Sequence, residues 1–92
     1  MIVNFKHKGL KNFFINNDGR LLNKQFISRI TRILDRLDVS EEVEDMNVPG
    51  WGFHPLKGNR KGVYAVTVNG NWRITFKFES AEAFDIDLED YH

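Results

Sequence analysis

The sequence contains no cysteine, only two prolines and no long run of apolar residues. The absence of cysteine excludes a disulfide framework, an iron–sulfur cluster and a zinc site built on cysteine, and it fits the reducing cytoplasm. No apolar run approaches the ~18 residues that a membrane-spanning helix needs, and residues 1–6 lack the charged and apolar regions of a signal peptide. We therefore expect a cytoplasmic protein without a membrane segment or a leader.

Size and composition fit one small domain. The 92 residues are 41% hydrophobic and 13% aromatic, and they contain no repeat and no low-complexity segment. A chain of this length buries roughly 60–70% of its unfolded surface, which is enough for a core without a disulfide. We expect a single domain over residues 1–92.

The charge is balanced only in sum. Thirteen basic and thirteen acidic residues cancel, which at first argues against a nucleic-acid partner. The order along the chain changes this, because the net charge is +6 over 1–37, −5 over 38–47, +5 over 48–78 and −6 over 79–92. A stretch of residues with one sign of charge can bind an oppositely charged partner even when the net charge of the chain is zero. The alternative is that the blocks pair with one another in the fold.

The N-terminal half is predicted to be mainly helical. Weak alternation over 2–5 predicts a first strand, and apolar residues at helical spacing over 10–14 predict a short helix. A longer helix is predicted from about 23 to 37, with Asn23 as its N-cap. Residues 40–42 read as the capped start of a further helical segment. One face of the longer helix carries three arginines, Arg29, Arg32 and Arg36.

The C-terminal half is predicted to be β-structure. Strands are expected over 63–68 and 71–78, joined by a type I′ turn at Asn69-Gly70, and a third strand follows at 84–89. The whole reads as an α+β domain of order β-α-α-β-β-β, with an antiparallel sheet packed against the N-terminal helices.

This turn also predicts which face of the sheet each side chain occupies. Val66 would pair with Arg73 and Ala65 with Ile74, and cross-strand partners share a face. The expected core side chains are Val63, Ala65, Trp72, Ile74, Phe76 and Phe78. The expected outer side chains are Tyr64, Val66, Arg73, Thr75 and Lys77. Arg73 would then be solvated, or paired with Asp85 or Asp87.

Residues 53–62 form a basic segment bounded by glycines, beside a predicted strand. Such a segment can hold a phosphate or can be an ordinary hairpin loop, and it lacks the spacing of a Walker loop. The histidines, His7, His54 and His92, show no metal-ligand spacing, so we expect no metal and no cofactor.

Five side chains together provide what RNA cleavage without a metal requires. An imidazole can exchange the protons, Lys and Arg can stabilise the charge on phosphorus, and an aromatic ring can stack on a base. The candidates are His54, Lys57, Arg73, Tyr91 and His92. For His92 the alternative is a frayed terminal residue.

Four motifs resemble the HigB toxins of the RelE/ParE toxin superfamily. They are Phe5-Lys6-His7-Lys8-Gly9-Leu10, His54-Pro55-Leu56-Lys57-Gly58, Asn71-Trp72-Arg73-Ile74-Thr75-Phe76 and Glu89-Asp90-Tyr91-His92. The resemblance implies a RelE-like fold and the toxin of a type II toxin–antitoxin system. Such a toxin enters the ribosomal A site, cleaves the mRNA codon there and inhibits translation. Its implied partners are the ribosome, mRNA and a HigA-type antitoxin, whose helix-turn-helix domain binds DNA.

The resemblance also implies the roles of six residues. His92 or His54 would be the acid and base, and Lys57 and Arg73 would hold the scissile phosphate. Tyr91 would orient the codon, and Asp90 would set the geometry or charge of its neighbours. The implied active site is His54, Lys57, Arg73, Asp90, Tyr91 and His92.

Two other functions remain open from the sequence. One is a ParE-like inhibitor that binds gyrase, although an inhibitor has no need of the terminal Asp-Tyr-His. The other is a non-catalytic RNA-binding regulator that uses the same basic face. The arginine face of the longer helix has its own alternatives: contact with ribosomal RNA, contact with an acidic antitoxin segment, or simple solvation.

Overall fold

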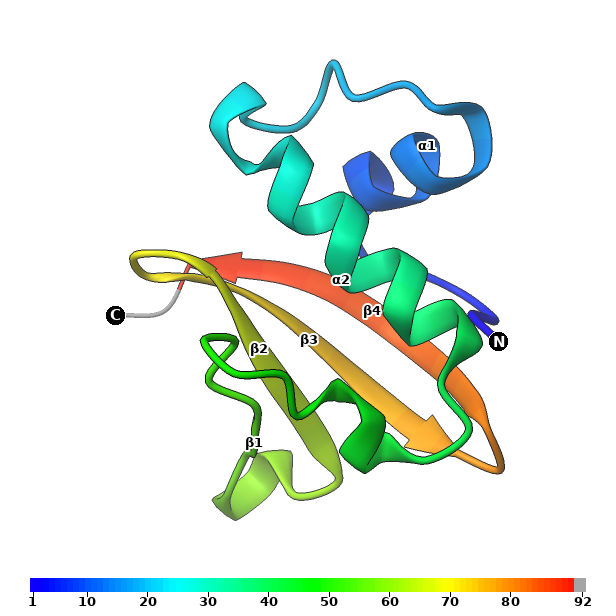
Figure 1. Ribbon diagram of the computed structural model, residues 1–92, viewed down its shortest axis with the longest axis vertical. Helices are drawn as coiled ribbons and strands as arrows, with labels where there is room; N and C mark the ends of the chain where they lie inside the picture. Colours follow the sequence, from blue (N-terminus) through cyan, green and yellow to red (C-terminus); the bar gives the residue numbers. More distant parts are fainter. Residues whose placement is uncertain (91–92) are drawn as a thin grey trace.

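The chain forms two helices and a four-stranded antiparallel sheet, and the computed structural model describes residues 1–90 (Figure 1). The strands lie in the order β1-β2-β3-β4, and α2 crosses one face of the sheet (Figure 1). The elements are α1 (Lys8–Asn16), α2 (Ile27–Val39), β1 (His54–Pro55), β2 (Val63–Asn69), β3 (Trp72–Glu79) and β4 (Glu82–Asp90). Short 3₁₀ helices occupy Lys24–Phe26, Val43–Met46 and Gly58–Arg60. The predicted α+β class is confirmed.

Both predicted helices are present, and their ends follow local capping chemistry. His7 caps α1, where its Nδ1 accepts a hydrogen bond from the Leu10 N–H at 3.2 Å. Asn23 is the predicted cap, and its Oδ1 accepts from the Gln25 N–H at 2.9 Å. It begins the 3₁₀ turn that leads into α2 rather than α2 itself. No helix among residues 1–90 has the length and apolar character to cross a membrane.

The expected helix start at 40–42 is wrong in detail. Ser40 instead ends α2, because its hydroxyl donates to the Arg36 carbonyl at 2.7 Å. The next helical turn is a 3₁₀ helix, Val43–Met46, for which Glu42 is the N-cap and Asp45 completes a capping box.

The predicted first strand is replaced by two isolated parallel bridges to β4. Ile2 pairs with Ala83 and Phe5 with Ile86. Between them, Asp85 has a φ of 53°, and its N–H is bound by Asn4 Oδ1 at 2.6 Å. This bulge interrupts the ladder, so the N-terminal segment covers the edge of β4 without forming a continuous strand.

The β2–β3 turn lies one residue later than predicted. Thr67 pairs with Arg73 and Asn69 with Trp72, so Gly70 and Asn71 are the turn residues and β2 bulges at Val68. Only Gly70 has a positive φ, 56°, which is the pattern of a type II′ turn and not of type I′. The faces of β3 are therefore as predicted, while those of β2 are exchanged.

The exchange places Val66 opposite Ile74 in the core and Ala65 opposite Thr75 on the other face. The buried core joins α1, α2, the 46–51 segment and one face of the sheet. Its members are Leu10, Leu22, Phe26, Ile30, Ile33, Leu34, Leu37, Met46, Trp51, Val66, Val68, Ile74, Phe76, Ala83 and Ile86. The opposite face of the sheet carries Arg73 and is covered in part, since Ala65 and Thr75 on that face are 0% and 1% exposed.

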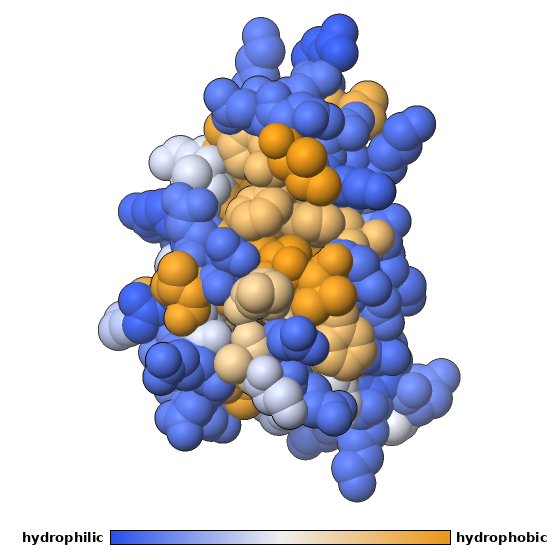
Figure 2. All heavy atoms as spheres, turned by 90° about the vertical axis from the view of Figure 1, so that its right-hand side faces the viewer, coloured by the Kyte–Doolittle hydropathy of each residue, from blue (hydrophilic) through white to orange (hydrophobic). Residues whose placement is uncertain are grey.

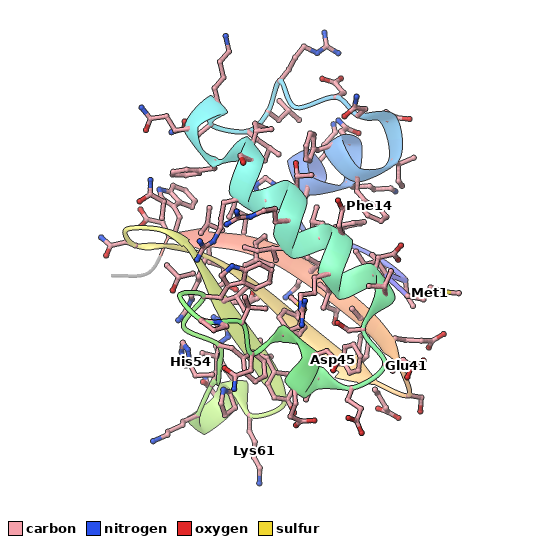
Figure 3. All side chains as sticks on the ribbon, in the orientation of Figure 1. Met1, Phe14, Glu41, Asp45, His54 and Lys61 are labelled. Atoms are coloured by element: carbon pink, nitrogen blue, oxygen red, sulfur yellow. The ribbon has the colours of Figure 1, made fainter. Side chains whose placement is uncertain are left out.

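Apolar side chains also gather on the surface at the right-hand side of Figure 1, where they form a continuous area surrounded by hydrophilic residues (Figure 2). Met1 and Phe14 lie on this side (Figure 3). The exposed large apolar residues of the described chain are Met1, Val3, Ile15, Leu21 and Val39.

Candidate active site

His54 begins the site, at the edge of the sheet. It lies in β1 opposite Ala65 of β2, and its side chain, which is labelled in Figure 3, is exposed. Its Nδ1 lies 2.8 Å from the Gly52 carbonyl oxygen. Since a carbonyl oxygen only accepts, the neutral ring carries its proton on Nδ1. Nε2 is then the nitrogen that can take up a proton.

The loop after β1 is held against the last strand by a bidentate ion pair. Arg60 Nη1 and Nη2 donate to the two carboxylate oxygens of Glu89, at 2.7 and 2.6 Å. Lys57 lies in the same loop and is exposed. The loop that contains Lys57 is therefore fixed to β4 by a side chain three residues away.

Glu89 is the centre of a small network on the outer face of the sheet. Thr75, which is only 1% exposed, donates its hydroxyl hydrogen to Glu89 Oε2 at 2.6 Å. Arg73 Nη2 lies 3.5 Å from Glu89 Oε1, and the Arg73 side chain is 14% exposed. Hydrogen bonds from Arg60 and from Thr75, with the charge of Arg73 near by, lower the pKa of Glu89 to about 2 against the opposing effect of burial. Glu89 is thus ionised at neutral pH, and it orients both arginines.

Three of the predicted site residues line one cavity. His54, Lys57 and Arg73 surround a space of about 340 Å³, together with Pro55, Leu56, Asn59 and Arg60. A second hollow of about 240 Å³ adjoins it, lined by His54, Arg73 and residues of the β2–β3 turn region. Residues far apart in the sequence therefore meet at one place.

The C-terminal motif is only partly described. Asp90 is the last residue of β4, exposed, and opposite Trp72, next to the Arg73–Glu89 pair. It therefore lies at the same end of the sheet as Arg73. The predicted site residues Tyr91 and His92 lie outside the described residues.

The pairing of Arg73 with Asp85 or Asp87, one of the alternatives that the sequence leaves open, is wrong. Its acidic neighbour is Glu89, directly opposite in the β3–β4 ladder, and neither Asp85 nor Asp87. Asp85 instead lies 3.6 Å from Lys77 Nζ. The bulge at Asp85 shifts the register of β4, and a periodicity argument does not detect such a shift.

Sequence reasoning also missed Arg60, Thr75 and Glu89 as parts of the site. The pairing of β3 with β4 brings Thr75 close to Glu89, and the connection between β1 and β2 brings Arg60 to the same carboxylate, so only the folded sheet unites the three. Within residues 1–90, no group of three or more His, Asp or Glu side chains is arranged to hold a metal ion.

The arrangement can bind a phosphate and move a proton beside it. Three cationic side chains, Lys57, Arg60 and Arg73, line the space that His54 also lines. Arg60 is paired with Glu89 through two hydrogen bonds. A phosphate there would be held by charge-assisted hydrogen bonds, within a cavity whose wall includes the His54 imidazole.

The sequence and the fold both have known relatives. A family described as the RelE-like toxin HigB of type II toxin–antitoxin systems matches residues 3–92. Endoribonuclease HigB of Proteus vulgaris is 41% identical over 92 residues, covering all of both chains. Toxin HigB-1 of Vibrio cholerae is 30% identical over 91 residues, covering 97% of this chain and 96% of the relative.

A solved structure shares the fold. The YoeB–YefM complex from Staphylococcus aureus contains a chain that aligns with a TM-score of 0.61 at 17% identity, covering 100% of this chain and 95% of the other. The sequence match extends over nearly the whole chain. This chain therefore belongs to the HigB family of RelE-like toxins, the toxin components of type II toxin–antitoxin systems.

Proposed function

We propose that this toxin is an endoribonuclease that cleaves mRNA in the A site of the ribosome, with acid–base chemistry supplied by its own side chains. The observation that carries the proposal is the shared cavity of His54, Lys57 and Arg73, where an imidazole and the cations of Lys57, Arg73 and Arg60 surround a space of about 340 Å³. The name of the Proteus vulgaris relative, an endoribonuclease at 41% identity over the full length, supports the same activity.

In the proposed reaction the ribose 2′-oxygen attacks the adjacent phosphorus. A general base removes the 2′-hydroxyl proton, the bond from phosphorus to the 5′-oxygen breaks, and a general acid protonates the leaving oxygen. The products are a 2′,3′-cyclic phosphate and a 5′-hydroxyl end. His54, with Nε2 as its proton-exchanging nitrogen, and His92 are the proposed acid and base.

The remaining site residues have supporting roles in this proposal. Lys57 and Arg73 stabilise the negative charge that builds up on the phosphate oxygens in the transition state. Tyr91 orients the codon, and Asp90 sets the geometry and charge of the residues beside it. Glu89 orients Arg73, through the 3.5 Å contact between the two side chains.

The proposed partners are the ribosome, its mRNA and a HigA-type antitoxin, and the proposed location is the cytoplasm. The relative in the YoeB–YefM complex supports an antitoxin partner, since that fold neighbour was solved as a complex. Contact with operator DNA is proposed only through the antitoxin.

Primer extension on mRNA with purified ribosomes tests the activity. We expect codon-specific cuts that are lost in His54→Ala, His92→Ala and Arg73→Ala variants that still fold and still bind ribosomes. Cuts that persist without His92 would contradict its role, and efficient cleavage of RNA without ribosomes would contradict ribosome dependence.

The nucleophile is tested separately. An mRNA with 2′-O-methyl groups on all nucleotides of the A-site codon should bind normally and remain intact, because it lacks the attacking hydroxyl. Cleavage of that mRNA would overturn the proposed reaction while leaving the nuclease activity itself in place.

A further inference from the structure

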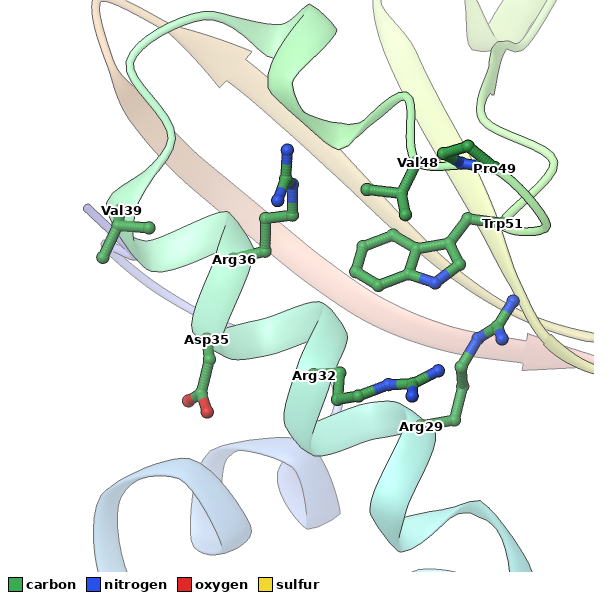
Figure 4. A pocket seen from close by; sticks show the side chains of 8 residues that line it. All are labelled: Arg29, Arg32, Asp35, Arg36, Val39, Val48, Pro49 and Trp51. Carbon is green, nitrogen blue, oxygen red and sulfur yellow. The ribbon is translucent and has the colours of Figure 1, made fainter.

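A groove of about 640 Å³ lies along α2, and it shares no lining residue with the cavities at His54 and Arg73. One wall is the exposed side of α2, and the other is the segment 48–51 (Figure 4). Its lining residues are Arg29, Arg32, Asp35, Arg36, Val39, Val48, Pro49 and Trp51. It therefore includes all three arginines of the basic face that the sequence indicates.

Two of these arginines are held in place by the backbone. Arg29 donates to the carbonyl oxygens of Thr67 and Gly50, at 3.3 and 2.7 Å, and its guanidinium lies 5.6 Å from the centre of the Trp51 ring. Arg36 Nε donates to the Asp45 carbonyl oxygen at 2.6 Å. A guanidinium has five N–H donors, so each keeps donors for a partner. Side chains already ordered in this way lose little entropy on binding.

The arginine face is therefore more than a solvated helix surface, and its chemistry is mixed. Val39 is 75% exposed at the C-terminal end of α2, and Val48 and Pro49 add apolar surface on the opposite wall. Asp35 adds one carboxylate beside the three guanidinium groups. An RNA backbone would leave Val39 uncovered and would be repelled by Asp35. A peptide with acidic and apolar side chains satisfies both the arginines and Val39.

We propose that this groove binds an acidic, amphipathic peptide segment of the antitoxin. Its carboxylates pair with Arg32 and Arg36, in the bidentate geometry that guanidinium groups favour, and its apolar side chains cover Val39 and Val48. The proposal rests on the proposed antitoxin partner, and it locates where that partner docks. The apolar area of Figure 2 is the competing surface, but no charge pattern there indicates its occupant.

Calorimetric titration of the folded chain with its HigA-type antitoxin tests the groove. Arg32→Glu and Val39→Asp should each weaken binding about tenfold or more, because one reverses the charge that attracts the segment and the other removes its apolar contact. Lys24→Glu and Ile15→Asp are matched controls, with the same chemical changes at exposed positions outside the groove. They should change binding less than about threefold.

Three results would overturn the proposal. The first is unchanged antitoxin binding in both groove variants, with thermal unfolding showing that they fold. The second is a larger loss in Ile15→Asp than in the groove variants, which would place the antitoxin on the surface of α1. The third is weaker ribosome binding in Arg32→Glu with unchanged antitoxin binding, which would make the groove an RNA contact.

A cross-linking measurement gives an independent answer that does not depend on altered charge. A photoreactive phenylalanine analogue at position 39 should cross-link to the antitoxin, and the same analogue at position 15 should not. Both readouts are binding measurements, so they stay informative even if the chain proves to cleave no RNA.

Discussion

Arg60 and Glu89 are joined by two parallel hydrogen bonds of 2.7 and 2.6 Å. These bonds connect the loop after β1 to the last strand, between residues that are 29 positions apart in the sequence. The same carboxylate accepts from the buried Thr75 hydroxyl and lies 3.5 Å from Arg73. One side chain thus links the loop that contains Lys57 to the arginine at the proposed phosphate site.

Breaking this link should loosen the site. We expect Arg60→Gln and Glu89→Gln each to lower the cleavage rate on ribosome-bound mRNA, and the double variant to be little worse than either single one. A double-mutant cycle on the free energy of unfolding should give a coupling of about 1–2 kcal/mol. Lys61→Gln, an exposed neighbour in the same loop, is the control. Full additivity of the two changes would contradict a coupled pair.

The same carboxylate predicts how stability depends on pH. The folded-state pKa of Glu89 is about 2, against an ordinary value of 4.5. Its contribution to the free energy of unfolding is therefore fully present above pH about 4.5, and it is lost as the pH falls through 2. We expect about 1–2 kcal/mol, reduced from the value that the shift alone implies because the side chain is partly solvated. Urea unfolding between pH 2 and 6 should show this loss in the wild type and a flatter profile in Glu89→Gln.

The position of His54 depends on Gly52. Gly52 has a φ of 60°, its carbonyl binds His54 Nδ1, and a Cβ there would lie 3.1 Å from Thr67 Oγ1. We expect Gly52→Ala to lower cleavage about tenfold or more, because it displaces the imidazole. Gly50→Ala is the matched control, since Gly50 also has a positive φ, 87°, but open space around it. Equal losses in the two variants would show that backbone strain, and not the placement of His54, matters.

The two residues in the turn between β3 and β4 do not favour the backbone conformation that they adopt. Ser80 and Ala81 have φ values of 53° and 63°, the left-handed conformation at both central positions that a type I′ turn requires. Neither is a residue that favours it. Replacing the pair by Asn-Gly should raise the free energy of unfolding by about 1 kcal/mol without changing cleavage, as measured by thermal unfolding. A destabilised variant would mean that the Ser80 or Ala81 side chain makes a contact worth more than this.

Periodicity predicted most of the architecture, because the helices and β3 follow their apolar spacing without interruption. Ile30, Ile33, Leu34 and Leu37 are buried as the helical stripe requires, and Ile74 and Phe76 lie in the core as the alternation of β3 requires. These patterns depend only on the regular geometry of each element.

Bulges caused the errors. One extra residue at Val68 exchanged the two faces of β2, and another at Asp85 gave Arg73 a different acidic neighbour. A bulge depends on how two strands fit together, and neither strand shows it alone. The Arg60–Glu89 pair was missed for the same reason, since the register of β4 decides which acid the loop can reach.

The N-terminal segment can take up its final position only after the last strand has formed. The Met1 ammonium donates to the Ala81 carbonyl at 2.8 Å, and the backbone of residues 1–6 bonds to that of Ala83 and Ile86. The Ile2 N–H donates to Asp38 Oδ1 at 2.9 Å, but the other backbone partners of this segment lie in the β3–β4 turn and in β4, so they exist only after nearly the whole chain has been made. Closing so long a loop costs entropy that local contacts do not repay, so folding should be slow for a chain of this size and close to all-or-none. A fragment that stops before β4 would have two unpaired sheet edges and a loose first helix. Proteolysis in β4 would thus inactivate the toxin by unfolding it, and not merely by removing side chains from its site.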